Sequence, residues 1–275
     1  MSGHAPAETS SGEAARGGRS PRGVTSSAAG WLAATAILAL ALLSAAPLAC
    51  TGSAGDLRIG TDGNYPPFNF LDESGEVTGF ERELGDELCR RADLDCVWVI
   101  TDWEGLIPSL VEGEIDAILA GMSITEERDR VIDFAGPYLP PAPSVYLAPA
   151  GSGDDVIDGT VAAQAATVHS DYLAEAGAEF REYDSPAGLL EAVLGGEADA
   201  ALVDLGFARE SIAASAGALA VVGPSVTLDR GIGLGLREGA GELRERIEQA
   251  LASMREDGSL NRLIFEWFGP DAELF

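Results

Sequence analysis

The sequence predicts an α/β fold in two lobes. Strand and helix signals alternate in two series, the first from Leu57 to Ala120 and the second from Thr160 to Ala214, and such alternation is typical of α/β folds. A Pro-rich run, LPPAPSVYLAPAGSGDD, separates the two series. Proline disfavours a packed helix, so this run is expected to be extended and to cross out of the first lobe. The chain from Cys50 to Phe275 is long enough for two modest cores.

The expected elements follow from short apolar runs and from helical spacing. In the first series they are strands at Leu57–Thr61, Cys96–Ile100 and Asp116–Ala120, with helices at Phe80–Arg91 and Gly105–Glu112. In the second series they are strands at Thr160–Ala163, Phe180–Tyr183 and Asp199–Val203, with helices at His169–Ala176, Pro186–Leu194 and Gly206–Ala214.

The chain is then expected to return to the first lobe. Ser225–Leu228 would cross back, and the run GIGLGL at Gly231–Leu236 would rejoin the first sheet, where glycines allow close backbone approach. The last part predicts a helix that stops at Gly258 and a second short helix, because its apolar residues have helical spacing. These residues are Leu243, Ile247, Leu251 and Met254. The predicted ranges are 57–145 and 228–275 for lobe 1 and 146–227 for lobe 2.

The N-terminal part reads as a targeting segment. Residues 1–30 are rich in Gly, Ser, Ala and Arg, and an apolar run from Trp31 to Ala49 follows them. This pattern is typical of a secretory signal, and the run is also long enough to be an uncleaved membrane anchor. We therefore exclude residues 1–50 from the fold and treat 51–56 as a linker. Cys50 resembles a lipoprotein acylation site, although Pro47 and Leu48 depart from the usual residues before it.

Cysteine use agrees with export. Of the three cysteines only Cys89 and Cys96 lie inside the predicted domain. A disulfide between them would join the last turn of a helix to the start of a strand in an oxidising compartment, and the alternative is two buried free thiols.

Charge and composition exclude other classes of function. The formal net charge is −28, with 17 basic and 45 acidic residues, so the chain lacks the basic face of a general nucleic-acid binder. The two histidines, His4 and His169, form no cluster with cysteine that would hold a metal. We expect no cofactor.

The stretch DAILAGMSITEERDRVIDF, Asp116–Phe134, predicts a strand, a turn and a helix. Ser123 followed by Glu126 is typical of a capping box at a helix start. A helix N-terminus favours an anion, and Arg128 would add a bidentate pair to a carboxylate. The alternative is that Arg128 is a solvated arginine among other charges.

The chain from Leu57 to Tyr138 resembles the first lobe of the bacterial polar amino-acid solute-binding proteins. The motifs that carry the resemblance are LRIGTDGNYPPFNF, GEVTGFERELGDEL and WEGLIPSLVEGEIDAILAGMSITEERDRVIDFAGPY. It extends through Phe268. The resemblance implies a two-lobed periplasmic-binding-protein-like fold of type II, with two hinge crossings and a discontinuous lobe 1. Histidine and lysine/arginine/ornithine binders of this family also carry a cysteine pair with the spacing of Cys89 and Cys96.

The resemblance implies a ligand site for an amino acid. Arg128 and Ser123 would hold the α-carboxylate, while the Gly121 carbonyl and Asp204 would hold the α-ammonium. Tyr65 and Trp103 would clamp the side chain, with Asp62 and Glu81 nearby, which favours a cationic or planar polar side chain. The other expected site residues are Ala120, Met122, Thr167 and His169. The turn QAATVH matches poorly apart from Thr167, because Ala166 and Val168 stand where the family usually has Gly and Thr.

Simpler structural roles exist for three of these residues. Asp204 could be only the N-cap of the following helix. Tyr65 and Trp103 could be core aromatics, although polar neighbours suit rings that line a cleft.

The expected function is binding of a polar L-amino acid outside the cytoplasm and its delivery to the permease of an ABC importer, by a monomer anchored through its N-terminus. Two alternatives use the same cleft. Cyclohexadienyl dehydratase resembles this fold, but its catalytic Glu lies where this chain has His169, which has no matched partner for acid–base work. A membrane-tethered amino-acid sensor cannot be distinguished by these residues.

Overall fold

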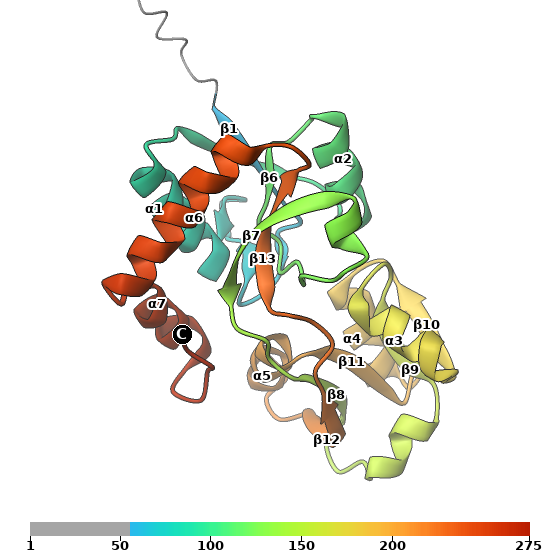
Figure 1. Ribbon diagram of the computed structural model, residues 1–275. Coiled ribbons are helices and arrows are strands. Elements are labelled where there is room, and N and C mark those ends of the chain that lie inside the picture. The colour runs from blue at the N-terminus through green and yellow to red at the C-terminus, as the bar shows by residue number, and fades with distance from the viewer. Residues whose placement is uncertain (1–55) are drawn as a thin grey trace, which may run out of the picture. The chain divides into compact units, whose positions relative to one another are not determined.

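The computed structural model describes residues 56–275, and Figure 1 shows its elements. The predicted signal or anchor segment and the lipidation at Cys50 lie outside the described residues and stay predictions. No helix between residues 56 and 275 is both long and apolar enough to cross a membrane.

The first sheet has five strands in the order β5-β1-β6-β13-β7. Strands β5, β1 and β6 run parallel, while β13 pairs antiparallel with both β6 and β7. The strands are β1 (Leu57–Thr61), β5 (Cys96–Ile100), β6 (Ala117–Ile118), β7 (Ile132–Leu139) and β13 (Ile232–Arg237).

Helices cover both faces of this sheet (Figure 1). One core lies under α1 (Phe80–Ala92), α6 (Gly241–Glu256) and α7 (Ser259–Phe268), where Ala117 and Leu236 face Leu84 and Leu251. The other lies under the short helix η1 (Trp103–Gly105) and α2 (Leu106–Glu112), and it contains Ile118 and Ile132. Neighbouring residues of β6 thus point to opposite faces, as the pleat of a strand requires.

The second sheet also has five strands, in the order β10-β9-β11-β8-β12. Strands β9, β10 and β11 run parallel, and β8 pairs antiparallel with β11 and β12. The strands are β8 (Ser144–Pro149), β9 (Val161–Gln164), β10 (Phe180–Tyr183), β11 (Ala200–Asp204) and β12 (Leu219–Val226).

Helices α3 (Val168–Ala176), α4 (Pro186–Gly195) and α5 (Leu205–Ala214) pack on this second sheet, and η3 (Asp154–Asp158) follows β8. Leu189 of α4 and Phe207 of α5 share one core with Val203, while Leu173 of α3 shares the other with Leu202. Each lobe therefore has cores on both faces of its own sheet, and the α/β prediction is confirmed.

Two segments connect the sheets, residues 140–143 between β7 and β8 and residues 227–231 between β12 and β13. Because β13 and the helices after it belong with the first sheet, lobe 1 is discontinuous, as predicted. The exact domain ranges stay a prediction. Strand β8 joins the second sheet at Ser144, which is two residues before the expected start of lobe 2.

The predicted helix after Ser123 is wrong. Ser123 forms an isolated antiparallel bridge with Ile232, and Ile124 N donates to Gly231 O at 2.8 Å. The chain is thus held extended against the segment that leads into β13. Only one turn of 3-10 helix follows, η2 (Arg128–Arg130), with the backbone N–H of Arg128 donating to Thr125 Oγ1 at 3.2 Å. No capping box forms here, because the bridge to Ile232 holds Ser123 extended.

Strands β7 and β12 were not among the expected strands, and three short strands were also not predicted. Strands β2 (Asn64–Tyr65), β3 (Asn69–Leu71) and β4 (Val77–Thr78) form a small antiparallel sheet between β1 and α1. They hold the loop that carries Asp62 and Tyr65. Strands this short give little periodic signal in a sequence.

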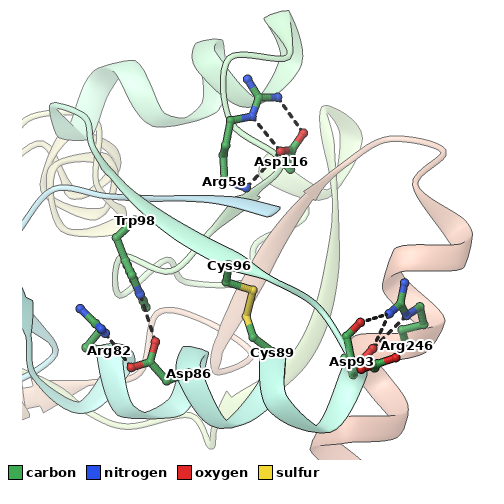
Figure 2. The surroundings of a disulfide bond; sticks show 10 residues. Arg58, Arg82, Asp86, Cys89, Asp93, Cys96, Trp98, Asp116 and Arg246 are labelled. Atoms are coloured by element: carbon green, nitrogen blue, oxygen red, sulfur yellow. Dashed lines mark hydrogen bonds and ion pairs between the residues drawn. A yellow bond between two sulfur atoms is a disulfide. The ribbon is translucent and has the colours of Figure 1, made fainter. Parts of the chain in front are cut away.

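Cys89 and Cys96 lie at disulfide distance, with the two Sγ atoms 1.92 Å apart and the Cα atoms 6.2 Å apart. Figure 2 shows the bond between α1 and the first residue of β5. At the end of the same helix, Arg246 of α6 donates to the backbone carbonyl of Asp93 at 2.8 Å. The predicted corner between helix and strand is therefore fastened at two points.

Candidate functional site

A small cavity of about 30 Å³ lies between the two lobes, and both lobes line it. The cavity lies beyond the carboxyl ends of β1, β9 and β11, where open α/β sheets bind ligands. Most of the predicted site residues line it, namely Asp62, Tyr65, Trp103, Ala120, Gly121, Ser123, Arg128, Thr167, His169 and Asp204.

Arg128 and Trp103 of lobe 1 reach across the cleft to one atom of lobe 2. Arg128 Nη2 donates to the carbonyl of Ala166 at 3.2 Å, and Trp103 Nε1 donates to the same oxygen at 3.1 Å. The Arg128 guanidinium stacks over the Trp103 ring at 5.3 Å, and its Nη1 donates to Ser123 O at 3.1 Å. Ala166 has a φ of 57°, a left-handed conformation that turns its carbonyl toward these donors.

Arg128 supplies positive charge to a cavity rich in carboxylates. Burial lowers the pKa of its guanidinium, and the carboxylates of Asp171 and Asp229 act in the opposite direction. An anionic group that entered the cavity would meet a planar donor whose orientation is fixed by stacking and by two carbonyls.

Tyr65 and Asp204 join the lobes directly. The Tyr65 hydroxyl donates to Asp204 Oδ2 at 2.6 Å. Burial, and after it the Asp204 carboxylate, raises the pKa of Tyr65 well above its ordinary value, so the hydroxyl keeps its proton. Asp204 precedes α5 but makes no side-chain hydrogen bond to the helix N-terminus. The alternative of a simple N-cap is therefore not realised, and the carboxylate faces the cavity.

The Tyr65 ring belongs to a stack that crosses the cleft. It lies on Phe207 of lobe 2 with centroids 4.6 Å apart and planes 11° apart, and on Phe68 of lobe 1 at 5.3 Å and 22°. Tyr65 is thus both a core aromatic and a cavity residue, which combines the two alternatives that the sequence left open.

Asp62 is a buried acid with a free oxygen. It is 8% exposed, and its Oδ1 is buried without a hydrogen-bond partner. Burial, and then the negative charge of Glu81, raises the pKa of Asp62 to about 7. A carboxyl group that lines a cavity in this condition can bind either a cation or a hydrogen-bond acceptor, depending on its proton.

Glu81 does not line the cavity, contrary to its predicted contact with the ligand. It is 0% exposed on α1, where its Oε1 accepts hydrogen bonds from Gly121 N at 2.6 Å and from the Tyr138 hydroxyl. Its Oε2 accepts from Asn69 Nδ2 at 2.7 Å. Glu81 therefore stands behind the cavity wall, because a helix starting at Phe80 turns its first residues toward the sheet.

Met122 also lies away from the cavity lining. It is 1% exposed and packs with Leu106, Ile118 and Ile132 in the core under α2. Its neighbours Gly121 and Ser123 do line the cavity, since successive residues of an extended chain point in opposite directions. Gly121 has a φ of 62°, a conformation that favours glycine at this turn.

The lobe 2 turn uses most of its polar groups internally. Thr167 caps α3, with its Oγ1 accepting from Ser170 N at 3.4 Å and donating to Gln164 O at 2.7 Å. His169 Nε2 lies 2.9 Å from Ser144 Oγ and 4.0 Å from Asp204 Oδ1. Burial lowers the pKa of His169, and the Asp204 charge opposes this shift. A capping box thus forms between Thr167 and Ser170, where none was predicted.

Several lining residues were not predicted. They are Gln164, Val168, Leu189, Leu202 and Val203 of lobe 2. Gln164 is 9% exposed and its Nε2 is buried without a hydrogen-bond partner. Gln164 is the last residue of β9, and ligands bind beyond the carboxyl ends of such strands, so its position was a signal that could have identified it. The four aliphatic residues come from regular elements whose cavity-facing side the sequence does not reveal.

The cavity combines a fixed guanidinium, acidic groups and two aromatic rings, which suits a small zwitterion. Among residues 56–275 no group of three or more His, Cys, Asp and Glu side chains could hold a metal ion.

Comparisons with known proteins show which proteins this chain is similar to. Residues 57–270 match the family of bacterial extracellular solute-binding proteins, family 3. The histidine-binding periplasmic protein of Escherichia coli (strain K12) is 33% identical over 261 residues, which cover 86% of this chain and 97% of that protein.

Solved structures are similar over the same region. The crystal structure of a periplasmic His/Glu/Gln/Arg/opine family-binding protein from Silicibacter pomeroyi in complex with lysine is 51% identical, with a TM-score of 0.77, and the match covers 80% of this chain and 100% of that one. The ancestral amino acid-binding protein AncCDT-1, a precursor of cyclohexadienyl dehydratase, is 32% identical with a TM-score of 0.69 over 78% of this chain and 96% of that one. The two-lobed architecture is that of the type II periplasmic binding proteins.

Proposed function

We propose that this chain, which belongs to the bacterial extracellular solute-binding proteins of family 3, binds a polar L-amino acid between its lobes and delivers it to the permease of an ABC importer. One observation carries the proposal. The Arg128 guanidinium and the Asp204 carboxylate come from opposite lobes and line one small cavity. An α-carboxylate and an α-ammonium need one partner of each sign when both lose their water.

In this proposal each lobe recognises a different part of the ligand. Arg128, with Ser123 beside it, holds the α-carboxylate through a planar two-point contact. Asp204 and the Gly121 carbonyl hold the α-ammonium. Arg128 now contacts the Ala166 carbonyl, and Asp204 now contacts the Tyr65 hydroxyl. In the bound state Arg128 and Asp204 would contact the ligand as well as these groups.

The ligand's side chain extends toward Asp62 and the rings of Tyr65 and Trp103. A buried carboxyl with a free oxygen, next to aromatic faces, favours a cationic or planar polar side chain. The crystallised Silicibacter pomeroyi relative was in complex with lysine, and the Escherichia coli relative is a histidine-binding protein. We therefore place arginine, lysine, ornithine, histidine and glutamine first among the candidates.

Export and anchoring complete the proposal. The apolar run before Cys50 would direct the chain out of the cytoplasm, a Cys89–Cys96 disulfide would form there, and lipid on Cys50 would hold the monomer at the membrane. Mass spectrometry of membrane-extracted protein would show an N-terminal lipidated Cys50, whereas an N-terminus beyond Cys50 or an intact apolar segment contradicts this anchor.

A ligand screen tests the function. The purified mature domain is titrated by calorimetry against the twenty amino acids, with prephenate and arogenate as further arms. We expect at least one polar amino acid to bind and neither of the last two to be converted. Turnover of prephenate or arogenate without amino-acid binding would instead support a dehydratase, with His169 in the cleft as its candidate acid or base.

A further inference from the structure

We propose that Asp62 releases a proton when it binds the cationic end of a ligand's side chain, and that the buried Glu81 behind it keeps that proton on Asp62 until the ligand arrives. This inference rests on the proposed function and deepens it, because it makes the choice between cationic and neutral side chains depend on pH.

Glu81 is the carboxyl group whose hydrogen-bond partners favour the charged form. Its two oxygens accept three hydrogen bonds, from Gly121 N, the Tyr138 hydroxyl and Asn69 Nδ2. These three donors favour the charged form of Glu81 and oppose burial, which raises its pKa.

The orientation of the Asn69 side chain is fixed from its other end. Asn69 Oδ1 accepts a hydrogen bond from Gly63 N at 2.8 Å, which leaves Nδ2 as the atom that faces Glu81. The amide cannot turn over without losing both bonds. Glu81 is thus connected through Asn69 to Gly63, the residue that follows Asp62.

Asp62 is the group that takes the proton. Its Oδ1 has no partner, and the cations and hydroxyls that share the cavity are directed elsewhere. Arg128 donates to the carbonyls of Ser123 and Ala166, and the Tyr65 hydroxyl donates to Asp204. His169 lies beside Ser144 and Asp204 on the opposite lobe.

The charges that face Asp62 therefore favour its neutral form. Glu81 of α1 presents a negative charge to Asp62, and Asp204 at the end of β11 lines the same cavity. Arg128 lies on the same lobe but donates to carbonyls. Burial first, and Glu81 second, raise the pKa of Asp62 to about 7, which puts the change of charge inside the physiological range.

The chemistry then differs between two kinds of ligand. When an ammonium or guanidinium approaches Oδ1, the O–H bond of Asp62 breaks, the proton leaves to solvent and the carboxylate pairs with the cation. When a side-chain amide approaches, the protonated Asp62 can instead donate its O–H to the amide oxygen, and no proton leaves. Gln164 Nε2, a free donor on the facing wall, also suits an acceptor. High pH thus favours cationic ligands and low pH favours neutral ones.

The test uses L-arginine, L-lysine and L-glutamine as probes. Each is titrated by calorimetry between pH 6 and 8.5 in buffers of different ionisation enthalpy, which gives the number of protons released. For arginine or lysine we expect about half a proton at pH 7 and almost none at pH 8.5, with affinity falling by up to about tenfold per pH unit below 7. For glutamine we expect no release at pH 6 and weaker binding at high pH.

Three variants identify the group. Asp62→Asn should abolish the release and make the remaining arginine affinity independent of pH. Glu81→Gln removes the facing charge and should shift the midpoint of the pH profile downward, which a purely structural role would not do. His169→Gln should keep the proton release even if it changes affinity, because His169 titrates on the other lobe. Circular dichroism checks that each variant is folded, and if Glu81→Gln does not fold, wild type and Asp62→Asn decide.

The outcomes are distinct. Cationic probes that bind without proton release and with the same affinity from pH 6 to 8.5 would overturn the inference and leave the proposed function intact. Glutamine binding without arginine or lysine binding at pH 8.5 would overturn it as well. If no amino acid binds at any pH, the proposed function itself fails.

Discussion

The two walls of the cleft use their polar groups differently. On lobe 1, Arg128, Trp103 and Tyr65 extend across the cleft and bond to the other lobe, and Asp62 keeps a free oxygen. On lobe 2, Thr167 caps its own helix and His169 lies against Ser144 of its own sheet. The lobe 1 wall therefore directs its polar side chains into or across the cleft, whereas lobe 2 contributes Asp204, Gln164 and the Ala166 carbonyl to the cleft.

The largest effect should come from removing the lobe 1 cation. We expect Arg128→Ala to weaken amino-acid binding by about 3–5 kcal/mol, a factor of roughly 10² to 10³ or more, because a ligand carboxylate enclosed between the lobes loses its partner. Arg128→Lys should restore only part of the affinity, since an ammonium lacks the planar fork. Titration calorimetry on each variant gives the affinities.

Arg130→Ala is the matched control for this prediction. Arg130 lies in the same turn of 3-10 helix, but its side chain is 74% exposed. Its ion pair is a long one, with Nη2 3.9 Å from Glu126 Oε2. Its removal should leave binding within about twofold, since exposed pairs contribute little. A folded Arg128→Ala protein that binds within threefold of wild type would contradict the proposed contact between Arg128 and the ligand's carboxylate.

Removing the disulfide should lower the stability of lobe 1. Replacing both Cys89 and Cys96 by Ser should lower the free energy of unfolding by about 2–3 kcal/mol in the chain-entropy account of so short a loop. The bond joins α1 to β5, so the loss should appear in hydrogen exchange of those elements and not in lobe 2. Chemical denaturation with and without reductant measures the effect, and equal stability in both conditions contradicts it.

Trp103 should affect the choice of ligand more than the ability to bind. Trp103→Ala removes the ring under Arg128 and the N–H to Ala166, and we expect a loss of about 1–2 kcal/mol that differs between amino acids. Trp103→Phe keeps a ring and removes only the donor, so it should cost less. A uniform loss across all ligands in a calorimetric panel would mean that the ring does not contact the side chain.

The smallest effect should come from lobe 2. Thr167→Ala removes the N-cap of α3 and should cost about 1 kcal/mol of folding stability. Thr167→Ser keeps the hydroxyl and is the control. Thermal unfolding measures both, and ligand affinity should change far less than in Arg128→Ala. If Thr167→Ala weakens binding as strongly as Arg128→Ala, the contrast between the walls is wrong.

The sequence predicted the elements well because most of them depend on local patterns. Helix α1 has apolar residues at helical spacing, and β9 and β11 are short apolar runs bounded by polar residues. Asp204 at the end of β11 and Arg128 in η2 were expected at one site by family resemblance, and the cavity brings them together.

What failed depends on contacts distant in sequence. The pair Ser123 and Glu126 looks like a capping box, but the bridge from Ser123 to Ile232 holds the chain extended, and no local signal reveals a partner about a hundred residues away. Glu81 was expected near the ligand's side chain as part of the site that the family resemblance implies. Its real partners, Tyr138 and Gly121, are supplied by other parts of the first lobe.

The indole of Trp103 gives the protein a built-in optical reporter. Three tryptophans lie in residues 56–275, and Trp98 and Trp267 pack against other residues of lobe 1, Arg82 and Phe70. Only Trp103 donates to a carbonyl of lobe 2, so opening of the cleft would expose its ring to water and shift its emission to longer wavelength. Intrinsic fluorescence should therefore follow the motion of the lobes in the unlabelled protein. The Trp103→Phe variant, which keeps Trp98 and Trp267, should show no such shift in emission.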